Sequence, residues 1–109
     1  MVNIEIPDSP LFEVVLNELR EGWKGKPINS DVSVIMTKDE LLSIIGENDF
    51  SENLRNESLT IMWSRFEEDG HFLTLCPNVS WDGKELTIDF RKEVIPYLLQ
   101  EKTAKINKV

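Results

Sequence analysis

The sequence contains few of the residues on which most enzyme and metal sites depend. Among 109 residues there is one cysteine, Cys76, and one histidine, His71. One cysteine cannot form an internal disulfide, and one cysteine with one histidine cannot complete a tetrahedral zinc site. The five glycines lie singly along the chain, so there is no glycine-rich phosphate loop. We therefore expect a non-enzymatic protein without a metal or a cofactor.

Basic residues are also in short supply. Twelve Lys and Arg face twenty Asp and Glu, which gives a net charge of −8. Phosphate binding needs clustered cations, so this balance argues against strong general affinity for nucleic acid or anionic membranes. Residues 1–83 hold six basic and sixteen acidic side chains, whereas residues 84–109 hold six basic and four acidic ones. Any phosphate contact is expected from that last segment, which contains Lys84, Arg91, Lys92, Lys102, Lys105 and Lys108.

Long hydrophobic runs are absent as well. No stretch approaches the roughly 18 apolar residues of a membrane-spanning helix. Residues 1–8 lack the basic and apolar regions of a signal peptide. A free cysteine fits a reducing compartment. The sequence therefore predicts a single cytoplasmic domain with no membrane partner.

Hydrophobic periodicity divides the chain into short helices and strands. In the first half it predicts a strand over 2–6, a helix from Pro10 to about Gly22, a strand over 32–36 and a helix over 38–45. Thr37 and Glu40 have the spacing of a capping box, in which each side chain bonds the backbone amide of the other residue. We therefore expect the helix over 38–45 to begin immediately after Thr37.

The second half predicts one more helix, a hairpin and a last helix. The third helix is expected over about 52–67 after a cap at Ser51, with its buried side formed by Leu54, Ile61, Met62 and Phe66. Residues 72–77 and 79–81 are expected to be extended. Asp82-Gly83 predicts a tight turn before a strand over 86–90. A helix over 91–101 and a flexible basic tail over 102–109 complete the prediction.

This order of elements is typical of an α+β winged helix. A helix, a short strand, a helix-turn-helix, a β-hairpin wing and a C-terminal helix follow one another. Other α+β folds share this order. We expect an N-terminal strand or arm over 1–9, a winged-helix-like domain over 10–101 and the tail over 102–109.

Two segments resemble the N-terminal winged-helix domain of plasmid replication initiator proteins, a family built from paired winged helices. Thr37-Lys-Asp-Glu-Leu-Leu-Ser-Ile-Ile-Gly46 resembles its short second helix. Trp81-Asp-Gly-Lys-Glu-Leu-Thr-Ile-Asp-Phe-Arg-Lys-Glu-Val-Ile-Pro-Tyr-Leu-Leu-Gln100 resembles its charged turn, alternating strand and following helix. The resemblance covers about residues 10–101 and implies a plasmid, phage or integrated-element origin. It also implies a domain that dimerises and contacts the DNA backbone. The chain departs from the family in having one such domain and in its acidity.

Two sets of residues are candidates for binding. The nucleic-acid set consists of side chains on the third helix and in the basic segment: Asn53, Arg55, Asn56, Arg65, Lys84, Arg91 and Lys92. The protein-interface set consists of aromatic residues: Trp23, Trp63, Trp81 and Tyr97. Each tryptophan has core packing as its alternative role. Glu67-Glu68-Asp69 is expected to be a solvated helix end, and Cys76 a buried, inert thiol.

Two functions follow from these observations. The first is a DNA-replication module that acts as a homodimer and contacts duplex DNA or a replication protein. The second is a small acidic inhibitor or adaptor that binds a host nucleic-acid-handling protein through electrostatic complementarity.

Overall fold

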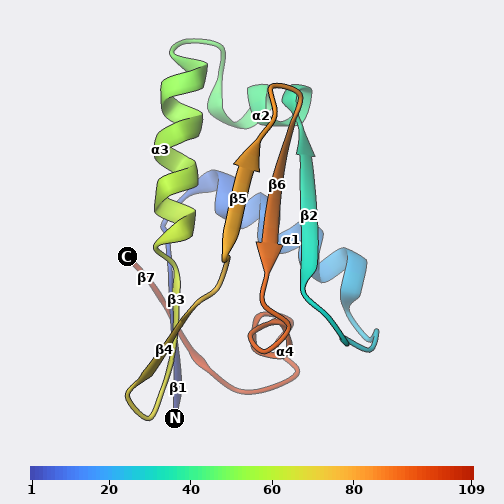
Figure 1. The fold of residues 1–109 in the computed structure, drawn as a ribbon, viewed down its shortest axis with the longest axis vertical. Coiled ribbons are helices and arrows are strands. Elements are labelled where there is room, and N and C mark those ends of the chain that lie inside the picture. Colours follow the sequence, from blue (N-terminus) through green and yellow to red (C-terminus); the bar gives the residue numbers. More distant parts are fainter.

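The computed structural model describes all 109 residues and confirms an α+β fold. The molecule measures 41 × 27 × 18 Å. Its elements follow the order β1 (Val2–Ile6), α1 (Pro10–Trp23), β2 (Val32–Thr37), α2 (Lys38–Ile45), α3 (Phe50–Met62), β3 (Arg65–Glu68), β4 (His71–Thr74), β5 (Asn78–Trp81), β6 (Glu85–Phe90), α4 (Ile95–Leu98) and β7 (Lys105–Lys108). The strands form two separate sheets (Figure 1).

The three-stranded sheet has the order β2-β6-β5, and all its pairs are antiparallel. Val34 faces Ile88 across β2 and β6, and Val79 faces Ile88 across β5 and β6. The alternate positions of β2 and β6 are buried, because each strand places an apolar residue on the core side at every second position. The predicted hairpin is confirmed, with Asp82 and Gly83 between β5 and β6.

Three helices pack with this sheet. Helix α1 passes behind it, α2 lies at the end of β2, and α3 lies beside β5 (Figure 1). The predicted capping box is present: the Thr37 hydroxyl accepts from the Glu40 amide at 3.2 Å, and Glu40 accepts from the Thr37 amide at 3.0 Å. Residues 46–49 connect α2 to α3, with Gly46 at a φ of 90° that favours glycine.

The four-stranded sheet has the order β4-β3-β1-β7. Strand β1 lies between β3, which runs antiparallel to it, and β7, which runs parallel. Ile4 is paired with Phe66 on one side and with Ile106 on the other, so its fully buried side chain has apolar neighbours on both strands. The sheet therefore joins the two ends of the chain to its middle.

The predicted third helix over 52–67 is wrong at both ends. Helix α3 begins at Phe50, so Ser51 lies inside it rather than capping it, and it ends at Met62. Residues 65–68 form β3, and Glu67-Glu68-Asp69 is therefore no helix end. The helical spacing of Phe66 was a coincidence, because Phe66 is buried through strand pairing with Ile4. Met62, expected in the core, is 42% exposed.

The C-terminal predictions also need correction. Only Ile95–Leu98 is helical within the predicted helix over 91–101. Residues 105–108, expected to be flexible, form β7, and the Val109 amide donates to the Ile6 carbonyl at 2.9 Å. Lys108 also forms an ion pair with Glu13 of α1 at 2.7 Å. Local composition favours a mobile tail, but pairing with β1 overrides it.

One continuous core supports both sheets. It contains 24 buried hydrophobic residues, drawn from the two sheets, the helices and the connecting segments. Leu75 and Cys76 are buried between β4 and β5, where the chain leaves one sheet for the other. The Leu75 amide donates to the Ser64 carbonyl before β3, and the Leu75 carbonyl accepts from the Arg91 amide after β6. These two bonds fix the crossing segment to both sheets. None of the helices combines the length and the apolar character needed to cross a bilayer.

Candidate functional site

Helix α3 carries three of the residues predicted to contact nucleic acid. Asn53, Arg55 and Asn56 are all exposed on it, and the Asn53 side chain donates to the Asn48 carbonyl at 3.2 Å. Arg55 is the only basic side chain between Phe50 and Met62, where Glu52 and Glu57 are acidic. The helix therefore has a net charge of −1 and a single cation with which to meet phosphates.

The other predicted basic residues lie apart from one another. Lys84 is in the β5–β6 turn, whereas Arg91 and Lys92 follow the opposite end of the six-residue strand β6, a separation of about 20 Å. Arg91 is already engaged, since its Nε donates to the Thr74 carbonyl at 2.8 Å. Arg65 lies on β3, outside the predicted helix, and stacks over Trp63 at 5.6 Å. These cations do not form one patch.

The four predicted interface aromatics have different surroundings. Trp23 and Tyr97 are partly buried against the core, and Tyr97 packs on Phe66 with ring centroids 5.3 Å apart. Trp81 is also partly buried and meets the Phe50 ring edge-on at 6.0 Å. Trp63 is the exception, because 68% of it is exposed. Trp63 and Trp81 thus lie at the two ends of α3, one exposed and one at the core boundary.

An apolar groove of about 360 Å³ runs between α3 and β5, which lie side by side in Figure 1. Leu59 is 46% exposed and Met62 42% exposed, and both line it from the helix. Val79 and Trp81 line it from the strand. Since Ser51 and Met62 both border the groove, it extends along the helix for about 16 Å, or three turns. The remaining lining residues are Leu54, Arg55 and Ser58. We call this surface the α3–β5 groove.

One end of the molecule beside this groove is strongly acidic. The α2 helix, the α2–α3 connection and the β5–β6 turn meet there (Figure 1), and the Lys38 amide donates to the Lys84 carbonyl at 3.0 Å. Residues 38–55 and 82–85 contain seven exposed acidic residues and three exposed basic ones, a balance of −4. The acidic residues of this acidic end are Asp39, Glu40, Glu47, Asp49, Glu52, Asp82 and Glu85.

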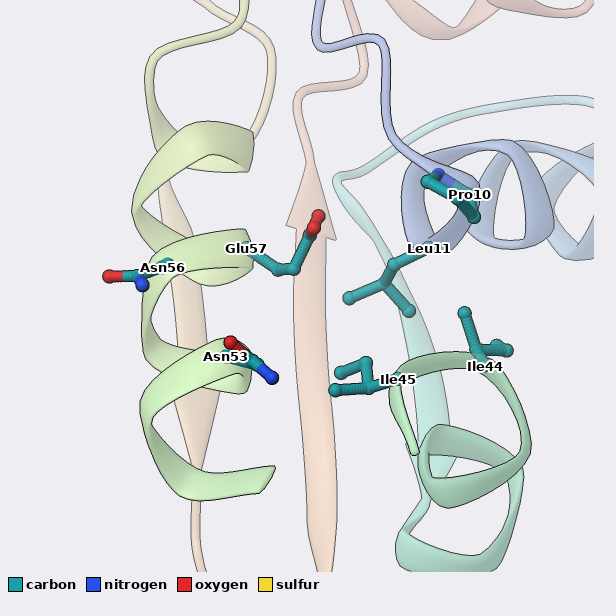
Figure 2. Close-up of a pocket in the computed structure, with 7 residues that line it drawn as sticks. All are labelled: Pro10, Leu11, Ile44, Ile45, Asn53, Asn56 and Glu57. Carbon is teal, nitrogen blue, oxygen red and sulfur yellow. The ribbon is translucent and has the colours of Figure 1, made fainter. Parts of the chain in front are cut away.

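A second cavity, of about 240 Å³, lies between α1, α2 and α3. Leu11, Ile45 and the carboxyl group of Glu57 face it, whereas Asn56 points away from the others (Figure 2). Glu57 accepts a hydrogen bond from Ser9, whose hydroxyl also accepts from the Phe12 amide at 3.2 Å and so caps α1. The polar wall of this cavity is therefore used to hold α1 against α3.

The single cysteine and the single histidine do not belong to a reactive cluster. Burial raises the pKa of the Cys76 thiol to about 12, so the residue is a buried, protonated thiol as expected. His71 is exposed on β4. No three His, Cys, Asp or Glu side chains are grouped so that they could hold a metal ion.

Sequence reasoning missed the helical wall of the α3–β5 groove. Leu54 and Ile61 fix the buried side of α3, and on a helical projection Leu59 and Met62 lie away from that side. The sequence contains this mismatch, but the predicted buried side includes Met62 together with Ile61. The strand wall could not be seen, because it depends on how β5 lies beside α3.

The chain matches no protein-family model, and neither a curated protein nor a solved structure is significantly similar to it.

Proposed function

We propose that residues 10–90 form a winged-helix module that acts by binding another protein in its α3–β5 groove. The order α1, β2, α2, α3, β5, β6 supports the winged-helix part, because it places a helix-turn-helix before a hairpin wing. The strand order β2-β6-β5 supports it too, since the first strand then pairs with the last one. The β3–β4 hairpin is an insertion between α3 and the wing.

The observation that carries the protein-binding part is the exposure of Leu59 and Met62 beside Trp81. Apolar side chains that line one groove on a soluble domain mark an interaction surface. Aromatic residues at such a surface are frequent binding hot spots. Duplex DNA offers phosphates to this face, and α3 has only Arg55 to meet them.

The occupant we propose is a basic amphipathic helix of a nucleic-acid-handling protein. Its apolar face would lie along Leu59, Met62 and Val79, as in other helix-in-groove complexes. Its cations would face the acidic end, whose balance of −4 is half of the net charge of the whole chain. This charge favours fast association and selects against acidic partners. The module is thereby an adaptor or inhibitor of a protein that itself binds nucleic acid.

The test is fluorescence anisotropy with a labelled synthetic helix that has leucines at positions i, i+3, i+4 and i+7 and lysines elsewhere. We expect binding that weakens as salt is raised from about 50 to about 200 mM. Leu59→Lys should weaken the affinity about tenfold or more, because it removes an apolar contact and adds a repelling charge. Ile35→Lys is the matched control, since Ile35 is 53% exposed on β2, which lies at the far edge of the three-stranded sheet from the α3–β5 groove. It should leave the affinity unchanged.

Two results would count against this function. One is equal binding of the synthetic lysine-rich peptide by the Leu59→Lys and Ile35→Lys variants. This result would show that charge alone attracts the peptide. The other is tighter binding of a random DNA duplex than of the helix, with a steep salt dependence that reports phosphate contacts.

A further inference from the structure

The β3–β4 hairpin ends one side of the four-stranded sheet and leaves β4 at its edge. Asp69 and Gly70 connect the two strands with φ values of 52° and 82°. Two successive positive φ values are the signature of a type I′ two-residue turn. The strand pairs that follow are Glu68 with His71, Glu67 with Phe72, and Phe66 with Leu73.

This turn fixes which backbone groups of β4 are free. In a two-residue hairpin the pair next to the turn exchanges both hydrogen bonds, and bonded and non-bonded pairs then alternate. His71 and Leu73 therefore bond to β3, while the amides and carbonyls of Phe72 and Thr74 point away from it. The Thr74 carbonyl agrees with this, because it accepts from Arg91 Nε at 2.8 Å. The backbone of Phe72 faces the open edge.

At Phe72 the β4 edge also lacks the usual protection against pairing, whereas Arg91 covers it at Thr74. Phe72 is 63% exposed and Leu73 38% exposed, one on each face of the sheet, and no residue of β4 carries a fixed charge. Natural sheet edges are commonly protected by lysine or proline. The opposite edge, β7, follows that rule with Lys105 and Lys108. The two edges of one sheet therefore differ in a way that leaves β4 open.

We propose that β4 pairs antiparallel with β4 of a second copy of this chain, about a two-fold axis at Phe72. Both free backbone groups of Phe72 then meet those of the partner's Phe72, and the sheet becomes continuous across eight strands. Hydrogen bonding between the two strands is confined to Phe72, because the Thr74 carbonyl already accepts from Arg91 Nε and the Gly70 amide already donates to Glu67. The Arg91 side chain, held at Thr74 by hydrogen bonds, then faces the acidic turn formed by the partner's Glu68 and the partner's Asp69.

This complementarity is the reason for choosing a second copy as the occupant. An uncharged strand meets an identical uncharged strand, and each copy contributes one cation and one acidic turn to the same two-fold contact, as an isologous interface requires. A four-residue strand buries less than the roughly 1,600 Å² of a standard stable interface. We therefore expect a weak dimer, with a dissociation constant on the order of 100 μM.

Cysteine cross-linking of the full chain tests the register. Phe72→Cys should form an intermolecular disulfide rapidly in mild oxidant, because directly opposed bonded residues have Cα atoms about 5.5 Å apart. Leu73→Cys is the matched control: its two copies lie diagonally, more than about 7 Å apart, and should cross-link far more slowly. Buried Cys76 does not compete, since burial raises its pKa to about 12.

Light scattering over a range of concentrations tests the association itself. The unmodified chain should show a rising mass average at high concentration, and Phe72→Lys should remain monomeric with unchanged circular dichroism. Leu59→Lys should dimerise like the unmodified chain, because the α3–β5 groove does not take part. A strict monomer at about 1 mM, or equal cross-linking of the two cysteine variants, would overturn the pairing. Neither result would affect the helix-binding test, which concerns a different surface.

Discussion

The two sheets of this protein are built in different ways. The three-stranded sheet takes its strands from residues 32–37, 78–81 and 85–90, and a tight Asp-Gly turn joins two of them. The four-stranded sheet takes β1 and β7 from the two ends of the chain and β3 and β4 from its middle. Each sheet contains one local Asp-Gly hairpin. Long-range pairing joins β2 to β6 across about 50 positions in the first sheet, and β1 to β7 across about 100 positions in the second. Composition alone is therefore a poor guide wherever a segment is stabilised by a distant strand, as β7 is by β1.

The largest expected effect tests whether the two sheets share one core. Ile4 and Ile88 are both fully buried, one in each sheet. Ile4→Ala and Ile88→Ala should each lower the free energy of unfolding by about 3 kcal/mol, since each leaves a cavity. Urea titrations followed by circular dichroism and tryptophan fluorescence should give one coincident transition for both variants. A separate early transition in Ile4→Ala alone would show that the four-stranded sheet unfolds independently.

A smaller loss of stability is expected from substitutions in β7, and it tests whether this segment is an ordered strand or a flexible tail. Ile106 is partly buried and paired with Ile4. Ile106→Lys should destabilise the protein by about 2 kcal/mol, because it places a charge against the core. Lys105→Ala, at the exposed neighbouring position, should change stability by less than about 0.5 kcal/mol. If both substitutions leave the thermal unfolding temperature almost unchanged, residues 105–108 form a flexible tail rather than an ordered strand.

The capping box at the start of α2, beside the three-stranded sheet, is a local sequence signal that can be tested in the same way. Thr37→Ala removes the hydroxyl that accepts from the Glu40 amide. It should lower the free energy of unfolding by about 1 kcal/mol. Thr37→Ser keeps that acceptor and should stay within a few tenths of a kcal/mol of the unmodified chain. Chemical denaturation of the three proteins provides the measurement, and a loss as large for serine as for alanine would remove the capping role.

The smallest effects are pH-dependent and should differ between the sheets. Backbone hydrogen bonds lower the pKa of Asp82 from its ordinary 3.8, and bonds from Thr37 lower the pKa of Glu40 from 4.5. The unfolded chain then binds protons more readily, so this stabilisation is complete above those ordinary values and is lost as the pH falls below them. Asp82→Asn should flatten the acid side of the stability profile.

The four-stranded sheet should show the opposite sign. The contact with Glu13 raises the pKa of Lys108 from its ordinary 10.5. This stabilisation is complete below that value and is lost as the pH rises through the raised pKa. Lys108→Met should therefore reduce the alkaline dependence measured by thermal unfolding. An alkaline limb that is the same in this variant as in the unmodified chain would contradict this assignment.

The sequence predicted those parts that depend on nearby residues. The capping box at Thr37, the helix from Pro10 and the turn at Asp82-Gly83 all act within a few positions, and each is present. Asp69-Gly70 is a second Asp-Gly turn. The helical spacing of Phe66 extends the predicted helix up to this turn, so the strand before it is not predicted. The parallel pairing of β7 with β1 joins residues about 100 positions apart, so no local pattern could reveal it.

The candidate site was only half accessible to sequence reasoning. Trp63 and Trp81 were identified as interface candidates from their residue type, and Trp81 does line the α3–β5 groove. Leu59 was not identified, because its exposure depends on which side of α3 meets the core. The basic residues were grouped by sequence position, but β6 separates Lys84 from Arg91 in space.

The most direct test of the central claim is amide chemical-shift mapping of the protein with two ligands, the lysine-rich helix and a random DNA duplex. Binding of a protein helix in the α3–β5 groove predicts shifts for the helix peptide at Leu59, Met62, Val79 and Trp81, and none for the duplex at these positions. Shifts caused by the duplex along the exposed side of α3, with none caused by the peptide in the groove, would contradict it. In that case α3 would read nucleic acid despite the acidity of the chain.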